Sequence, residues 1–145
     1  MKTRISTYSL IIGLLLTINY SCVQAQATFS DNEAKVALKS FYTSYMTEFS
    51  NLSPSREKKL SAIKSKYCTE ALLKKLPALT EQTDSDPLLK AQDSDAAWLK
   101  TLTIERDSKK PNTYSVSYID GGNNKTVIHL TLTKQGSAIK IASVW

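Results

Sequence analysis

The sequence predicts an α+β domain in which helices come first and a four-stranded antiparallel sheet follows. From residue 30 to residue 76, apolar residues recur at spacings of three and four, which is typical of helices with one buried face. After Ala96 the spacing changes to two, and four β-branched segments alternate with short turn sequences. Connections this short join neighbouring antiparallel strands. Helices followed by such a meander indicate one α+β domain.

The first helix is expected to start at Ser30. Ser30 and Glu33 form a capping box, in which each side chain binds the backbone N–H of the other residue. An apolar stripe about 100° wide follows on one face of the helix. Its members are Ala34, Leu38, Phe41, Tyr42, Tyr45 and Phe49.

Two shorter helices are expected next. Pro54 suits the first turn of a helix, where its missing N–H is not needed. Leu60, Ile63 and Tyr67 give this second helix an apolar face. Residues 69–76, "TEALLKKL", predict a third, short helix that ends at Pro77.

Four strands are expected in the second half, at residues 98–107, 113–120, 126–134 and 138–145. In the third strand alternate residues such as Ile128 share one face, while His129 lies on the other. One face of the sheet is therefore predicted to be buried under the helices, and the other to be wetter. The buried face is almost wholly apolar and comprises Ile104, Val116, Ile128, Leu130, Ile139 and Ile141.

The first residues predict export. Lys2 and Arg4 precede an apolar run at residues 8–18, which is about half the ~20 residues that cross a bilayer and is interpreted as a signal sequence. The sequence favours residues 1–25 as the signal peptide, with cleavage before Gln26 and a single mature domain at residues 26–145. The alternative is a lipoprotein signal at residues 1–21 with Cys22 lipidated. The expected location is periplasmic or secreted, and the protein is expected at a membrane only if Cys22 carries lipid.

Export narrows the partners that the net charge allows. Removing Lys2 and Arg4 from the 19 basic residues leaves 17, against 13 acidic residues. An exported domain rarely meets nucleic acid, and the chain has no zinc-finger spacing and no dense arginine run, so no nucleic-acid partner is expected. The basic balance favours an acidic partner or an anionic envelope surface, unless it is only a solvated face.

An acidic stretch, "DSDPLLKAQDSD" at residues 84–95, raises the question of a metal site. Compared with a twelve-residue calcium loop, it has oxygen-bearing side chains at positions one, three, nine and twelve. Position five is Leu88 where an oxygen ligand is needed, and position six is Leu89 where the sharp turn requires Gly. The sequence therefore predicts no metal site and no cofactor.

A structural role fits the acidic stretch better. A proline follows Asp86 and excludes a helical conformation at Asp86. Asp86 is expected to cap a short turn in which Leu88 and Leu89 fill the junction between the helices and the sheet. Gln92 and Asp93 are expected to bind nearby backbone groups at the entrance to the first strand.

Three other candidates have structural interpretations. His129 is the only histidine and is expected on the surface, as is usual for a lone His in an alternating strand. It has no second His to make a zinc site, and a catalytic triad would need a suitable Ser or Cys close by. Cys68 is the only cysteine of the predicted mature domain, and is expected to be a buried thiol beside Tyr67 and not a reactive one. Residues 120–125, "DGGNNK", lie between two strands and predict a hairpin turn in place of a phosphate loop.

Several short segments carry a family resemblance. They are "FYTSYMTEF", "KYCTEALLKKL", "DPLLKAQD" and "LTLTKQGSAIKIASVW", which span much of residues 34–145. The chain resembles the exported proteins of the DUF3828 type, a branch of the NTF2-like (cystatin-like) class. The resemblance implies a curved, cone-shaped sheet under the helices and an envelope location. It implies no reaction and no ligand.

Two classes of function remain open. The first is a non-catalytic domain that binds a small molecule or an envelope protein, with Tyr42, Tyr45, Asp86, Asp93 and Tyr118 as the candidate ligand-binding residues. The second is an enzyme in which Asp86 or Asp93 moves a proton and Tyr118 or Tyr114 donates a hydrogen bond. The apolar inward face of the sheet offers no polar group to tune such a carboxylate. The sequence therefore favours binding over catalysis.

Overall fold

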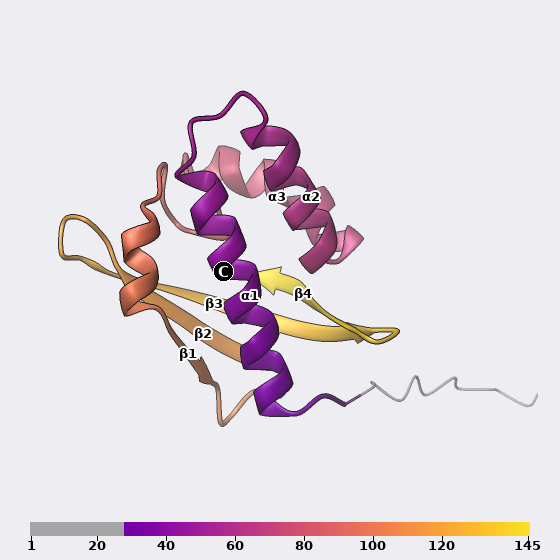
Figure 1. Ribbon diagram of the computed structural model, residues 1–145. Coiled ribbons are helices and arrows are strands. Elements are labelled where there is room, and N and C mark those ends of the chain that lie inside the picture. The colour runs from indigo at the N-terminus through magenta and orange to yellow at the C-terminus, as the bar shows by residue number, and fades with distance from the viewer. Residues whose placement is uncertain (1–27) are drawn as a thin grey trace, which may run out of the picture.

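The computed structural model describes residues 28–145 (Figure 1). The predicted signal peptide, its cleavage site and Cys22 lie outside the described residues. Within the described part of the chain, no helix is both long enough and apolar enough to span a bilayer.

The elements follow the predicted order of helices and then strands. Three α-helices come first, namely α1 (Asp31–Phe49), α2 (Arg56–Tyr67) and α3 (Glu70–Thr83). A 3-10 helix, η1 (Ala96–Thr101), leads to four strands, namely β1 (Thr103–Arg106), β2 (Thr113–Ile119), β3 (Lys125–Gln135) and β4 (Ala138–Val144). Each strand pairs antiparallel with the next in chain order, so the sheet is the predicted meander.

The starts of the helices follow local side-chain chemistry. At α1, Ser30 Oγ accepts a hydrogen bond from the Glu33 N–H at 3.2 Å, and the Glu33 carboxylate accepts one from the Ser30 N–H at 2.7 Å. The predicted capping box is therefore present. At α3, Thr69 Oγ1 accepts from the Leu72 N–H at 3.2 Å, which serves one of the N–H groups that a helix start leaves without a partner.

The predicted end of the third helix is wrong. The helix α3 continues through Pro77 and ends at Thr83. Pro77 removes one backbone hydrogen bond, and the residue is exposed on the outer side of the helix. Leu72 and Leu76 are buried before the proline and Leu79 packs on the core after it, so the apolar face of α3 continues across the proline.

The predicted first strand is also partly wrong, because residues 96–101 form η1 and only Thr103–Arg106 is a strand. Asp95 Oδ1 accepts from the Ala97 N–H at 2.7 Å and caps the turn. The Trp98 ring stacks on the Tyr118 ring with centroids 5.2 Å apart and planes 12° apart. Capping and stacking together favour a helical turn over an extended chain at this point.

The three α-helices pack on one face of the sheet, where α1 contacts both edge strands, β1 and β4 (Figure 1). The buried core lies between them and includes Val116, Ile128, Leu130 and Ile141 from the predicted inward face. Ile104 and Ile139 are half-buried and pack against the same core. A register shift between Thr131 and Leu132 marks a β-bulge, which bends β3 where it pairs with β4.

Candidate functional site

The acidic stretch folds into a turn capped by Asp86, as predicted. Asp86 Oδ1 accepts hydrogen bonds from the N–H of Leu88 at 2.8 Å and of Leu89 at 3.1 Å. The Asp86 carbonyl also accepts from Lys90, whose φ of 54° turns the chain back. The backbone of Asp86 then pairs with Ala91, which closes the loop. The segment of residues 86–91 is therefore a closed turn whose polar groups bind one another.

Three tyrosines attach this turn to the core. Tyr42 donates to the Leu88 carbonyl at 3.1 Å, and Tyr118 donates to the Leu89 carbonyl at 2.6 Å. Tyr45 donates to Asp86 Oδ2 at 2.7 Å. These tyrosines come from α1 and β2, so they hold the turn from both the helix layer and the sheet.

The leucines of the turn fill the space between helices and sheet. Leu88 and Leu89 are both 0 % exposed, which confirms the prediction that they occupy this junction. Tyr42 and Tyr45 are equally inaccessible, and Tyr118 is almost so. The tyrosines thus use their rings as core and their hydroxyls as attachments for the turn.

Asp86 is the carboxylate with the most unusual surroundings. Its burial raises its pKa above the ordinary value, and the hydrogen bonds from Tyr45 and from the Leu88 N–H act in the opposite direction. Burial also raises the pKa of Tyr118 to about 12, and it raises that of Tyr45 further. The tyrosines therefore stay protonated and act as hydrogen-bond donors. Both oxygens of Asp86 already accept hydrogen bonds from the protein.

The other predicted site residues are dispersed. Asp93 is exposed and does not bind the backbone at the strand entrance. Gln92 was expected to accept hydrogen bonds from backbone N–H groups there, but its side-chain amide donates to the Asp84 carbonyl at 3.0 Å. Tyr114 is buried in β2, with its hydroxyl near Asp31 and not near Asp86. The ligand-binding role of these residues stays a prediction. Within residues 28–145, no group of three or more His, Cys, Asp and Glu side chains is placed to hold a metal ion.

Three structural interpretations are confirmed. His129 is exposed on the outer face of β3, where its ring stacks on Trp145. Cys68 is buried, and this burial raises the pKa of its thiol to about 12, which keeps the thiol protonated. The turn at 120–124 is a hairpin, in which Asp120 Oδ1 accepts from the N–H groups of Gly122 and Asn124.

A pocket of about 350 Å³ lies beside Asp86, between α2 and the turn. Lys64 and Glu57 of α2 line it, together with Tyr45 and Asp84. The positive charge of Lys64 opposes part of the rise that burial causes in the pKa of Asp86. This pocket contains both positive and negative side chains, so its charge selects neither an anionic nor a cationic ligand.

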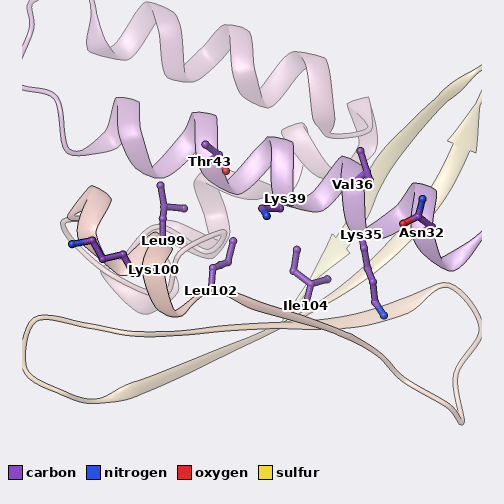
Figure 2. A pocket seen from close by; sticks show the side chains of 9 residues that line it. All are labelled: Asn32, Lys35, Val36, Lys39, Thr43, Leu99, Lys100, Leu102 and Ile104. Carbon is purple, nitrogen blue, oxygen red and sulfur yellow. The ribbon is translucent and has the colours of Figure 1, made fainter.

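A second hollow differs from it in charge. A groove of about 500 Å³ lies between α1 and the segment from η1 to β1 (Figure 2). In Figure 2, Leu99 and Lys100 lie below Thr43, and Ile104 lies further along, between the positions of Lys39 and Lys35, so the two segments run in opposite directions along the groove. The residues that give it its character are Lys35, Val36, Lys39, Lys100, Leu102 and Ile104.

The groove is basic with an apolar floor. No acidic side chain lines it, whereas three lysines do. Lys35 pairs with Asp31 at 2.7 Å, but Lys39 and Lys100 have no ion-pair partner within the described part of the chain. Val36 is 56 % exposed and adds apolar surface beside the lysines. The sequence analysis did not predict this groove. The available signal was Val36, an apolar residue that falls outside the buried apolar stripe of α1.

Comparisons with known proteins support the fold. No protein-family model matches the chain, and no curated protein matches it. The structure is similar to a crystal structure of a protein of unknown function from Bacteroides thetaiotaomicron, with a TM-score of 0.73 and 25 % identity over 79 % of this chain and 89 % of that one. It is also similar to a chain of the native type VI effector–immunity complex Tae3–Tai3 from Ralstonia pickettii, with a TM-score of 0.54 and 20 % identity over 78 % of this chain and 94 % of that one. At this identity the second likeness shows the fold alone.

Proposed function

We propose that this protein is an exported, non-catalytic domain that binds another protein of the bacterial envelope through its surface. The observation that carries the proposal is the filled interior. Leu88 and Leu89 occupy the space between helices and sheet, and two tyrosine hydroxyls, those of Tyr42 and Tyr118, bind their carbonyls. A small molecule would have to displace this turn to reach the inward face of the sheet. Recognition of a protein at the surface needs no such change.

Two further observations support the proposal. A basic groove with an apolar floor is open at the surface, and such mixed chemistry suits a protein interface. A chain of similar fold occurs in an effector–immunity complex, which is an assembly of proteins. Export rests on the basic start and the apolar run at residues 8–18. We also propose membership of the DUF3828 type, on the four segments that resemble it.

The alternative is a carboxylate enzyme, and the raised pKa of Asp86 beside a pocket of about 350 Å³ favours it. Against it, Asp86 Oδ1 accepts from two backbone N–H groups and Oδ2 accepts from Tyr45, so three of the roughly four acceptor positions of the carboxylate are already used to hold the turn. Asp93, the other predicted base, is exposed to solvent. A substrate beside it would therefore not be shielded from water. These two observations favour a binding domain over an enzyme.

Native mass spectrometry of the protein isolated from the envelope of its own cells tests the proposal. We expect a chain that starts at Gln26, or a diacylated Cys22 in the lipoprotein alternative, in a stoichiometric complex with a second protein. A free monomer that carries a small molecule of constant mass would contradict protein binding. Recovery of an intact chain with Met1 from the cytoplasm would contradict export.

A further inference from the structure

The two edges of the sheet differ in how they are covered. At the β4 edge, the Thr69 N–H donates to the Ile141 carbonyl at 2.9 Å, so the chain between α2 and α3 pairs with this edge. Lys140 Nζ also donates to the Ser65 carbonyl at 3.2 Å. At the β1 edge, no described segment pairs with the strand. The β4 edge is therefore partly covered at Ile141, whereas the β1 edge carries no paired segment and offers its outward backbone groups to a partner.

The register shows which backbone groups of β1 face outward. The Asp107 N–H donates to the Thr113 carbonyl at 2.9 Å, and in an antiparallel pair such hydrogen-bonded positions alternate. Glu105 and Thr103 are therefore the next residues that bind β2. Ile104 and Arg106 point their N–H and C=O groups away from β2, towards the open edge. No hydrogen bond to these groups is formed within residues 28–145.

The basic groove runs between α1 and η1 and reaches this open edge at Ile104. Ile104 belongs both to the groove and to the edge of β1, and Lys39 and Lys100 stand on opposite sides of the groove (Figure 2). From Asn32 to Thr43 the groove follows α1 for eleven residue steps, or about 16 Å at ~1.5 Å per residue. That length fits roughly five residues of extended chain at ~3.3 Å each.

The spacing of charges along α1 suits a strand. Lys35 and Lys39 are one helical turn apart, which is about 6 Å. Alternate side chains on one face of a strand are separated by about 6.6 Å. Acidic residues at alternate positions of an added strand would therefore share the face that meets the lysines of α1, and the residues between them would point to the other face of the sheet.

We propose that the partner docks by adding an extended, acidic segment to the β1 edge, with its carboxylates against Lys39 and Lys100. This inference rests on the proposed function and names the surface and the partner chemistry for it. Strand addition supplies affinity through main-chain hydrogen bonds to Ile104 and Arg106, and the lysines select for acidic residues. A small anion would use the lysines and leave the edge unpaired.

The direct test uses the ¹⁵N-labelled mature protein and an acetylated heptapeptide with Glu at alternate positions and Val between them. We expect shifts of the Ile104 and Arg106 amides and slower exchange of both, because strand addition protects them. Replacing each Glu of the peptide by Gln should weaken binding about tenfold, since exposed charge pairs contribute ~1 kcal/mol or less each and two or three are lost. Absence of shifts with about millimolar peptide, or equal binding of the Gln peptide, would overturn the proposal.

Variants connect this test to the native partner. Lys39→Glu combined with Lys100→Glu should abolish the complex isolated from the envelope, while Lys75→Glu should not, because Lys75 is exposed on α3 away from the groove. Thermal unfolding checks that each variant is folded. If the complex survives in the double variant, the groove is not the docking surface, although protein binding as such still holds. If the parent protein forms no complex at all, the proposed function itself is contradicted. A homodimer with protected edge amides and no peptide would assign the edge to a second copy and also overturn the proposal.

Discussion

Truncation of Leu88 or Leu89 to alanine measures how much the turn at residues 86–91 contributes to stability. Both side chains are 0 % exposed and lie between helices and sheet. Loss of a fully buried leucine typically costs about 2–5 kcal/mol, out of roughly 5–15 kcal/mol for a whole domain. We expect each variant to lose that amount, because the closed turn prevents its neighbours from moving into the cavity.

The hydroxyls that hold the turn should contribute less than the leucines do. Tyr42→Phe and Tyr118→Phe each leave a buried carbonyl without its donor, which costs about 1–3 kcal/mol. Asp93→Asn is the control, because Asp93 is exposed and should change stability by less than about 0.5 kcal/mol.

Urea unfolding at neutral pH, followed by Trp fluorescence, separates these values. For a domain of this size, ~2–5 kcal/mol also corresponds to a fall in melting temperature of roughly 8–20 °C. If both leucine variants unfold like the parent while Asp93→Asn loses stability, the turn is not a structural junction. The acidic stretch would then have to be reconsidered as a functional site.

Three further predictions concern the titratable and metal-binding groups. Burial raises the pKa of folded Asp86 above the unfolded value of about 3.9. Protonation of Asp86 therefore adds stability that is complete below about pH 3.9 and is lost as pH rises through the folded pKa. Asp86→Asn should remove this pH dependence from urea unfolding, and an unchanged pH profile would refute the assignment. Cys68, with a pKa of about 12, should not react with a disulfide reagent at pH 8 until urea unfolds the protein, and fast labelling of the native state would contradict its burial. Calcium should leave the melting temperature unchanged, because positions five and six of the acidic stretch are Leu88 and Leu89; a rise of about 10 °C that is lost in Asp84→Ala would show a calcium site.

The periodicity of the sequence was sufficient to predict the layers of the fold. The stripe on α1 is buried except at its last member, Phe49, which is half-buried. Alternation in β3 placed Ile128, Leu130 and Leu132 inward and His129 outward, as the structure has them. These predictions succeeded because burial of one face is what fixes the period of each element.

Boundaries depend on tertiary contacts that a local pattern does not contain. Pro77 was expected to end α3, but leucines on both sides of it bind the same core and keep the helix in register. Trp98 was expected in a strand, but it stacks on Tyr118, which is twenty residues away in the sequence. In both cases the contact that decides the local conformation comes from another element.

The candidate site divides in the same way. Asp86 as a cap could be predicted, since an aspartate and a proline determine a turn locally. Its bond to Tyr45 and the attachment of the leucine carbonyls to Tyr42 and Tyr118 could not, because they join residues 29 to 46 positions apart. The groove is harder still, since its lysines come from α1 and η1 and meet only when the fold brings these elements together.

Charge alone does not identify the functional surface of this domain. The acidic stretch attracts attention in the sequence, yet Asp86 binds its own turn and Asp84 binds Gln92. The lysines of the groove are unremarkable in the sequence, yet Lys39 and Lys100 find no carboxylate within the described chain. A polar group that the fold already satisfies gains little from a ligand, whereas an unmatched charge beside an open strand edge gains both an ion pair and backbone hydrogen bonds. On this reasoning, substitutions at Lys39 should change partner binding with little effect on folding, and substitutions at Asp86 should do the reverse.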